Sequence, residues 1–375
     1  MNGARQNPVV LAAGGSGGHV FPAEALAKEL AGRGLRLVLI TDRRGDAYGG
    51  ALGDIDTHRI RAGGIAGKSI AARLKSGPEL AIGTWQARSL LKHIKPSVVV
   101  GFGGYASVPT MLAATFGGYK TVIHEQNAIL GRANRLLAGR VDRIATSFEA
   151  TRALPATSLD KVLCCGMPVR APIIATRDIP YPPLGDTLPL NILVLGGSQG
   201  ASVLSDVIPK ALALLDKDLR SRISLTQQCR PEDLDKTRSA YERMGLDATL
   251  SQFFDDVPKR MAAAHLLIGR SGASTVAEAT VIGRPAILVP YPHAIDDHQT
   301  FNAHALDEAG GGWLMSQDTF TAEGLSARLQ SLLRVPEVLQ KAAAGARAAG
   351  RPDAAILLAD MVCDLLDANG ERRAA

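Results

Sequence analysis

The feature that most constrains the fold is a pattern of apolar strand, glycine loop and helix that occurs twice in the chain. The first copy begins at Val9 and reads VVLAAGGSGGHVFPAEALAKEL, and the second begins at Asn191 and reads NILVLGGSQGASVLSDVIPKALALL. Further apolar strands that alternate with helices follow each copy. This alternation is typical of a parallel sheet covered by helices on both faces. We therefore expect an α/β protein with two Rossmann-like, doubly wound domains and a cleft between them.

A proline-rich segment separates the two copies. Between Met167 and Pro189 the alternation stops, and prolines stand at positions 168, 172, 180, 182, 183 and 189. Such a run favours an irregular and rather stiff connection. A chain of 375 residues also exceeds the length over which one hydrophobic core keeps growing. We place the domain boundary here, with a first domain at residues 1–166 and a second at residues 167–351.

The first glycine loop does not match two common phosphate-binding motifs. A dinucleotide fingerprint with Asp42 as the ribose-binding acid would need glycine where Val20 stands. A Walker A loop would need lysine and then serine or threonine, and these do not follow Gly18. Two interpretations remain. The loop either opens a helix N-terminus to an anionic or oxygen-rich ligand, or only closes a tight turn between strand and helix.

Composition argues against several classes of function. The four cysteines have no metal-binding spacing, so we expect buried thiols rather than disulfides or a metal site. The net charge of +6 is spread along the chain and aromatic residues make up only 4%, so nucleic-acid binding is not expected. We find neither a signal peptide nor an apolar run long enough to span a bilayer.

Five short motifs, taken in order, carry a resemblance to a known family. They are GGSGGHVFP (14–22), GFGGYAS (101–107), HEQN (124–127), GGSQGA (196–201) and RSGASTVAE (270–278). In this combination the chain resembles the MurG family of peptidoglycan N-acetylglucosaminyltransferases. The resemblance implies the GT-B architecture, in which the N-terminal domain receives a lipid acceptor and the C-terminal domain holds UDP-GlcNAc. It also implies that a helix at about residues 352–370 returns to the first domain.

The family's reaction is an inverting glycosyl transfer. By resemblance, the chain transfers GlcNAc from UDP-GlcNAc to the 4-hydroxyl of MurNAc in undecaprenyl-pyrophosphoryl-MurNAc-pentapeptide, converting lipid I to lipid II in peptidoglycan biosynthesis. Neither a cofactor nor a metal is expected, and the adjacent pairs Asp255-Asp256 and Asp296-Asp297 are interpreted as helix caps. Two alternatives stay open. One is a non-hydrolysing UDP-sugar epimerase, and the other is a catalytically inactive UDP-sugar-binding protein.

Such a transfer needs a base for the acceptor hydroxyl and stabilisation of the leaving diphosphate. His19 is the first candidate for the base, because it precedes a helix expected from about Val20 to Arg33, and the positive end of a helix favours neutral imidazole. Glu125 is the second candidate, because it ends an apolar strand at the edge where parallel sheets bind ligands. The alternative for both residues is that they only cap a turn or a strand end.

The resemblance also supplies a set of residues that bind the substrates. Glu278 is expected to bind the ribose diol, a role that suits the two acceptor oxygens of a carboxylate. Its alternative is a capping box with Thr275. Asn127 is expected to contact the donor or the acceptor sugar. The remaining donor-site residues are Ser16, Gly17, Gly18, Arg170, Ser198, Phe254, Ala273, Ser274, Thr275, Val276 and Gln299.

The chain departs from the family pattern at three positions. Ser16 stands where threonine is common, Met167 replaces an asparagine, and His298 precedes Gln299 where another amide can occur. The first exchange is conservative. The other two exchanges concern the expected contacts of Arg170 and His298.

A basic and apolar segment is expected to bind an anionic membrane surface. In this segment Pro78 is expected to open a helix, and an ordinary surface helix is the alternative. The residues concerned are Arg61, Ile65, Lys68, Ile70, Arg73, Leu74, Lys75, Leu80, Trp85, Arg88 and Lys92. We therefore expect a peripheral protein on the cytoplasmic face of the inner membrane. Its expected partners are UDP-GlcNAc, the undecaprenyl-linked muramyl-pentapeptide and other cell-wall synthesis proteins.

Overall fold

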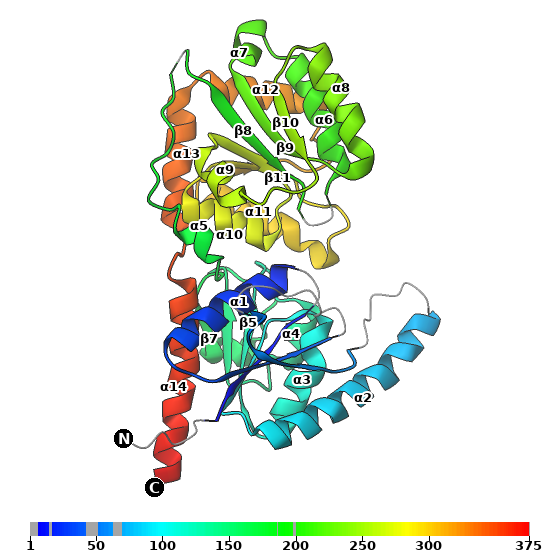
Figure 1. Ribbon diagram of the computed structural model, residues 1–375, viewed down its shortest axis with the longest axis vertical. Helices are drawn as coiled ribbons and strands as arrows, with labels where there is room; N and C mark the ends of the chain where they lie inside the picture. Colours follow the sequence, from blue (N-terminus) through cyan, green and yellow to red (C-terminus); the bar gives the residue numbers. More distant parts are fainter. Residues whose placement is uncertain are drawn as a thin grey trace. The chain divides into compact units, whose positions relative to one another are not determined.

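The computed structural model divides the chain into two compact units (Figure 1). Unit 1 comprises Met1–Arg170 together with Pro352–Ala375, and unit 2 comprises Ala171–Arg351. The structure describes residues 7–14, 17–42, 52–62, 70–185, 187–197 and 200–374, and of residues 70–76 and 368–374 it describes the backbone alone. The division thus falls at Arg170, inside the proline-rich segment.

Unit 1 is built on a seven-stranded parallel sheet. Its strand order is β3 (Asp56–Arg59), β2 (Leu37–Thr41), β1 (Val9–Ala12), β4 (Val98–Gly101), β5 (Lys120–Glu125), β6 (Arg143–Thr146) and β7 (Val162–Cys164). The order reverses between β1 and β4, as in doubly wound folds, where ligands bind at the reversal.

Helices cover both faces of this sheet, because its central strands are apolar on both sides. Val9 and Leu11 of β1 point to a core shared with α1 (Gly17–Gly32) and α14 (Ala354–Ala374), whereas Val10 and Ala12 point to the opposite core. That second core contains residues of α2 (Ile70–Ile94), α3 (Gly104–Phe116) and α4 (Arg132–Leu137). A 3-10 helix, η3 (Ala156–Lys161), precedes β7. Figure 1 shows α14 lying beside α1.

Unit 2 repeats the plan with six parallel strands. The strand order is β10 (Ala248–Ser251), β9 (Ile223–Gln228), β8 (Leu190–Leu195), β11 (Leu266–Gly269), β12 (Ala286–Leu288) and β13 (Gly312–Leu314). Its helices are α5 (Ala171–Ile174), α6 (Ser202–Ala213), α7 (Lys217–Ser221), α8 (Leu234–Arg243), α9 (Val257–Ala263), α10 (Ala273–Ile282), α11 (His298–Glu308), α12 (Ala322–Leu333) and α13 (Pro336–Ala349), with 3-10 helices η4 (Pro231–Asp233) and η5 (Ile295–Asp297). These two Rossmann-like sheets confirm the expected α/β fold class.

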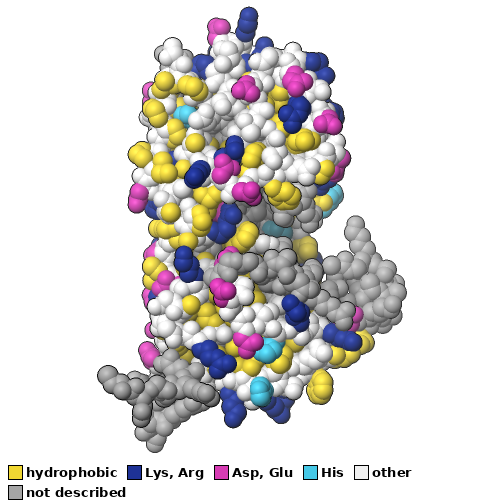
Figure 2. Space-filling model, viewed as in Figure 1, with side chains coloured by type: hydrophobic (Ala, Val, Ile, Leu, Met, Phe, Trp, Pro, Cys, Tyr) yellow, Lys and Arg dark blue, Asp and Glu magenta, His cyan; other side chains and the backbone are white. Residues whose placement is uncertain are grey.

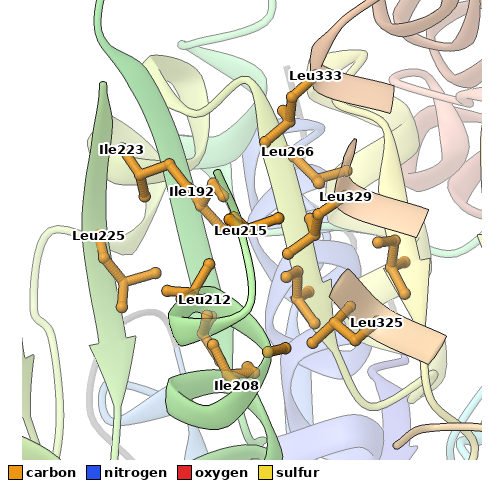
Figure 3. Packing of buried hydrophobic residues seen from close by; sticks show 14 of the residues in the cluster. Ile192, Ile208, Leu212, Leu215, Ile223, Leu225, Leu266, Leu325, Leu329 and Leu333 are labelled. Atoms are coloured by element: carbon orange, nitrogen blue, oxygen red, sulfur yellow. The ribbon is translucent and has the colours of Figure 1, made fainter. Parts of the chain in front are cut away.

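The core of unit 2 lies between the sheet and two helices on one of its faces. Figure 3 shows strand residues such as Ile192 and Leu225 facing Ile208 and Leu212 of α6 and Leu329 of α12. All five side chains are almost fully buried, and each such side chain contributes about 1.5–3 kcal/mol relative to an exposed one. This packing holds the carboxyl ends of β8 and β11 in place.

Two helices begin earlier than the sequence predicts. Helix α1 starts at Gly17 rather than near Val20, so His19 lies in its first turn. Helix α2 starts at Ile70 and contains Pro78 in its interior, so the expectation that Pro78 opens this helix is wrong. Pro78 is exposed, so water can hydrate the carbonyl that the missing N–H of proline leaves unpaired. Among the described residues, no helix has the length and apolar character needed to cross a bilayer.

Candidate active site

Three neighbouring strands of unit 1 bring the motif residues together. The glycine loop that contains Gly14 follows β1, residues 102–104 follow β4, and the HEQN motif includes the end of β5. Because β1, β4 and β5 are adjacent and parallel, their carboxyl ends meet at one edge of the sheet. A Cβ on Gly14 would come within 2.7 Å of Ala106 Cβ on α3, so only glycine allows the first loop this close to α3.

His19 is half-buried and held at one ring nitrogen. Its Nδ1 lies 2.9 Å from the carbonyl oxygen of Phe102 and 3.0 Å from Oε1 of Gln126. A carbonyl oxygen only accepts hydrogen bonds, so Nδ1 carries the hydrogen. In the neutral ring, Nε2 then keeps the lone pair. The ring is thereby oriented as a base that uses Nε2.

Gln126 and His124 form a buried polar pair beside His19. The Nε2 amide group of Gln126 donates to the Phe102 carbonyl at 2.9 Å and to Nδ1 of His124 at 3.0 Å. The Nε2 of His124 donates to the Gly166 carbonyl at 3.1 Å. Burial lowers the pKa of His124 to about 4, because desolvation disfavours the charged ring. His124 is therefore neutral at physiological pH, with Nδ1 as acceptor.

Two successive glycines follow β4, and the second of them leaves room next to the His19 ring. Gly103 and Gly104 both have positive φ, 75° and 67°, which side chains rarely adopt. A Cβ on Gly104 would lie 3.1 Å from Cδ2 and 3.2 Å from Nε2 of His19. Gly104 is also the first residue of α3. The Nε2 edge of His19 therefore faces the start of a helix that carries no side chain there.

Glu125 is buried, and donors from the loop after it and from α4 surround it. Oε1 accepts from the backbone N and from Nδ2 of Asn127, at 3.0 and 3.2 Å. Oε2 accepts from Gly131 N and from Asn134 Nδ2, both at 2.8 Å. A carboxylate with two donors on each oxygen holds a loop in place. Asn127, expected as a sugar contact, is therefore engaged with Glu125.

In unit 2, the corresponding edge lies at the ends of β8 and β11. These two strands are adjacent and form the reversal point of the sheet, and a Cβ on Gly269 would come within 2.5 Å of the Leu195 carbonyl. Gly196 and Gly197 follow β8, and α10 begins with Ala273 shortly after β11. The two glycine-containing loops of unit 2 thus leave the sheet side by side.

The first turn of α10 contains the expected donor-site residues Ala273, Ser274, Thr275 and Val276. Gly272 is the N-cap residue and provides no side-chain hydrogen bond, so the first N–H groups of the helix remain available for a ligand. Because Thr275 lies inside the helix rather than at its N-cap, the capping-box interpretation of Glu278 is wrong. Glu278 follows within the same helix and is buried.

The other expected residues have different surroundings. Gln299, near the start of α11, accepts from the backbone N of Tyr291 at 2.9 Å, and Asn302 of the same helix donates to the Ser271 carbonyl at 3.1 Å. The Phe254 ring lies 4.4 Å beneath the Arg260 guanidinium. Arg170 ends unit 1, with its guanidinium 4.9 Å from the Phe21 ring of α1. Gly17 and Gly18 open α1, whereas Ser16 and Ser198 lie outside the described residues.

Sequence reasoning missed three contributors to this arrangement. They are Gln126, Asn134 and the backbone carbonyl of Phe102, which connect His19, His124 and Glu125. Gln126 stands within the HEQN motif, so the motif itself was the available signal. The other two contributions depend on how the chain folds, with Asn134 on α4 and Phe102 just after β4, and could not be found from spacing.

The acidic pairs have a local role. Asp256 and Asp297 are the N-cap residues of α9 and α11, as expected, but no side-chain cap hydrogen bond forms at either position. Asp256 instead accepts from Arg260 at 2.6 Å, and Asp297 from Thr300 at 2.7 Å. Within the described part of the chain, no group of three or more His, Cys, Asp or Glu side chains has the arrangement of a metal site.

Comparison with known proteins finds the same domains and the same fold. The model of the glycosyltransferase family 28 N-terminal domain matches residues 9–146, and that of the C-terminal domain matches residues 191–358. A protein of Paramagnetospirillum magneticum is 60% identical over 362 residues, 96% of this chain and 98% of that protein. It is named UDP-N-acetylglucosamine--N-acetylmuramyl-(pentapeptide) pyrophosphoryl-undecaprenol N-acetylglucosamine transferase. The crystal structure of Acinetobacter baumannii MurG has a TM-score of 0.77 at 30% identity, covering 95% of this chain and 99% of that chain.

The epimerase alternative has a structural counterpart but no close sequence relation. UDP-GlcNAc 2-epimerase from Neisseria meningitidis, bound to UDP-GlcNAc, has a TM-score of 0.65 at 14% identity, covering 95% of this chain and 100% of that chain. At this identity the likeness shows a common fold and nothing more. The relative with 60% identity over nearly the full length is a transferase, which favours the transferase interpretation.

Proposed function

Since this chain belongs to glycosyltransferase family 28 and to its MurG group, we propose that it transfers GlcNAc from UDP-GlcNAc to the 4-hydroxyl of MurNAc in undecaprenyl-pyrophosphoryl-MurNAc-pentapeptide. The chain is a glycosyltransferase of the GT-B fold, and this reaction converts lipid I to lipid II in peptidoglycan biosynthesis. The observation that carries the residue assignment is the orientation of His19, whose Nδ1 is held by the Phe102 carbonyl and Gln126.

In this proposal His19 is the general base. The reaction is a single displacement with inversion. The acceptor oxygen forms a bond to the anomeric carbon as the bond from that carbon to UDP breaks, and Nε2 of His19 takes the hydroxyl proton. A base that begins neutral is required, and the starts of α1 and α3 lie beside the ring. General-base catalysis of this kind contributes about 10²–10⁴-fold.

Glu125 has a different role in the proposal. All four of its described hydrogen bonds come from Asn127, Gly131 and Asn134, so a proton taken up by this carboxylate would break contacts that hold the loop. We assign Glu125 to positioning the HEQN loop and α4, and Asn127 to the same hydrogen-bonded unit. The same loop supplies Gln126 to His19, which connects the fold of this segment to the proposed base.

The start of α10 is the proposed site for the diphosphate of UDP. Its uncapped first turn offers backbone N–H groups and the positive end of the helix dipole, which stabilise negative charge as it develops on the leaving group. Glu278 on the same helix is buried, and its two oxygens suit the two hydroxyls of a ribose. Ser198, Phe254 and Gln299 remain proposed donor contacts on the strength of the family resemblance.

The test is UDP release with UDP-GlcNAc as donor, with and without lipid-linked acceptor. We expect His19→Ala to lower kcat by roughly a hundredfold or more, with little change in donor affinity. His58→Ala is the matched control, since His58 lies on the edge strand β3. Normal turnover of His19→Ala would remove His19 from the base role. Epimer formed from UDP-GlcNAc without acceptor would instead favour the epimerase activity.

We also propose that unit 1 binds an anionic membrane surface through α2. Ile82 and Trp85 are exposed on this helix, Trp85 to 71%, and Arg88 and Lys92 follow at spacings that continue the same face. Figure 2 shows basic and hydrophobic side chains next to one another along the lower edge of unit 1. Each basic residue near anionic headgroups contributes about 1 kcal/mol. Lys68 and Ile65 lie outside the described residues, and the side chains of Arg73 and Lys75 are not described.

Vesicle sedimentation tests this proposal. We expect the double variant Ile82→Ser, Trp85→Ser to bind vesicles that contain phosphatidylglycerol several-fold less tightly than the parent protein does. Phe253→Ser, which changes an aromatic side chain 70% exposed in unit 2, is the control. Equal binding of all three proteins would place the membrane contact elsewhere.

A further inference from the structure

We propose that Gln126 is a positioning residue that sets the tautomer of His19, so that Nδ1 carries the hydrogen and Nε2 receives the proton of the acceptor hydroxyl. The inference rests on the proposed role of His19 as the base. Gln126 then contributes to the transfer reaction without contacting a substrate.

The orientation of the Gln126 amide follows from two backbone carbonyls. One end of the amide lies 2.9 Å from the Phe102 oxygen and 3.1 Å from the His124 carbonyl oxygen. Both oxygens only accept hydrogen bonds, so this end must be the NH₂ group. The carbonyl end, Oε1, therefore faces Nδ1 of His19 at 3.0 Å.

The two partners of Nδ1 determine which ring nitrogen of His19 carries the hydrogen. Both partners of Nδ1, the Phe102 carbonyl and Gln126 Oε1, are acceptors. A neutral imidazole has one N–H, and this arrangement places it on Nδ1. If the amide were reversed, its NH₂ group would face Nδ1 and favour the other tautomer. The lone pair would then be on the nitrogen that points away from the start of α3.

His124 prevents this reversal of the amide. Its Nε2 donates to the Gly166 carbonyl, so in the neutral ring Nδ1 is an acceptor and receives the Gln126 NH₂ at 3.0 Å. His124 is fully buried and keeps a single hydrogen because burial lowers its pKa to about 4. A reversed amide would place its oxygen against two carbonyls and a ring lone pair. Hydrogen bonds thus connect Gly166 through His124 and Gln126 to His19.

The fixed tautomer determines what the Nε2 edge of the His19 ring offers to an acceptor. The Nε2 edge lies where Gly104 has no side chain, beside the N-terminus of α3. An acceptor hydroxyl that approaches from this side meets a lone pair only in the Nδ1–H tautomer. Free histidine favours the Nε2–H tautomer, so the protein must supply the free energy of this preference. The hydrogen bonds that Nδ1 of His19 donates to Phe102 and Gln126 are sufficient for that purpose.

Nuclear magnetic resonance of the full chain labelled with ¹⁵N-histidine reads the tautomers directly. The His19 and His124 signals are assigned from their absence in His19→Asn and His124→Phe. In the parent protein we expect Nδ1–H at His19 and Nε2–H at His124. In Gln126→Met, which keeps the length of the side chain but removes its hydrogen bonds, we expect His19 to shift toward the Nε2–H tautomer. Gln86→Met is the matched control, because Gln86 bonds the backbone N of Arg61 instead.

Turnover is measured on the same proteins with UDP-GlcNAc and the lipid-linked acceptor. We expect Gln126→Met to lower kcat about tenfold with an unchanged KM for the donor, since the Phe102 carbonyl still holds part of the orientation. His124→Phe should have a smaller effect in the same direction, because both carbonyl contacts of Gln126 remain. Gln86→Met should match the parent protein.

Each outcome bears on a different step. An Nε2–H tautomer at His19 in the parent protein would overturn the inference, and this measurement holds even if Gln126→Met does not fold. Unchanged tautomer and unchanged kcat in a folded Gln126→Met would also overturn it. If the tautomers are as expected but His19→Ala keeps full turnover, the hydrogen-bonded chain stands and the proposed base role fails.

Discussion

Replacing Glu125 with glutamine distinguishes a structural role of this carboxylate from a catalytic one. Each oxygen of Glu125 accepts two hydrogen bonds, so whichever side the new NH₂ group takes, it faces two donors. Leaving a partly buried donor unsatisfied costs about 2 kcal/mol, so two such donors cost about 4 kcal/mol. For a unit of this size, that loss lowers the melting temperature by roughly 8–16 °C.

Calorimetry and turnover together decide between the two roles. We expect Glu125→Gln to lower the melting temperature of unit 1 by that amount, while kcat below the transition falls less than about tenfold. Glu79→Gln, at an exposed position on α2, is the matched control and should leave both quantities unchanged. The structural argument is refuted if Glu125→Gln melts within 2 °C of the parent protein, a margin well below the range above, and yet loses turnover a hundredfold.

Three further outcomes follow from buried groups in the two units. Gly104→Ala should lower kcat strongly without changing donor KM, because its Cβ would crowd Nε2 of His19 at positive φ. Arg284→Met should lower the melting temperature of unit 2 without changing kcat. It removes a buried guanidinium that donates to the carbonyls of Ala262, Ile282 and Pro180, at a cost of about 3 kcal/mol or more. The His124 ring resists protonation in the native state, with a pKa of about 4 against 6.5 when unfolded, so the free energy of unfolding should fall as pH drops from 6.5 to 4, by roughly 3 kcal/mol. Denaturant titrations should show a loss that is larger in the parent protein than in His124→Phe by about this amount, since His265, whose pKa burial also lowers, is present in both.

The repeated strand and glycine loop predicted the two parallel sheets because strand burial on both faces leaves a continuous apolar run, as in Val98–Gly101. Helix starts were harder to predict. The glycines that precede His19 are poor helix formers, yet α1 begins at Gly17, so local helix propensity does not place this helix start. The capping box at Thr275 failed for a related reason, since a local sequence match does not say which residue the chain places at the N-cap.

The choice between His19 and Glu125 shows what local sequence could not settle. Both residues lie at the same edge of one sheet, and both types of side chain serve as bases. Their roles differ because their hydrogen-bond partners lie at different distances along the chain. The donors to Glu125 come from the loop and the helix α4 that follow it, so local structure occupies both oxygens of the carboxylate. His19 bonds Phe102 and Gln126, which other strands bring to it, and those two contacts occupy Nδ1, the nitrogen that a base acting through Nε2 does not use. A base must keep one lone pair away from the hydrogen bonds that orient it. At this edge of the sheet, the described contacts of His19 involve Nδ1 and leave the lone pair of Nε2 for the proton. The described contacts of Glu125 involve both of its oxygens.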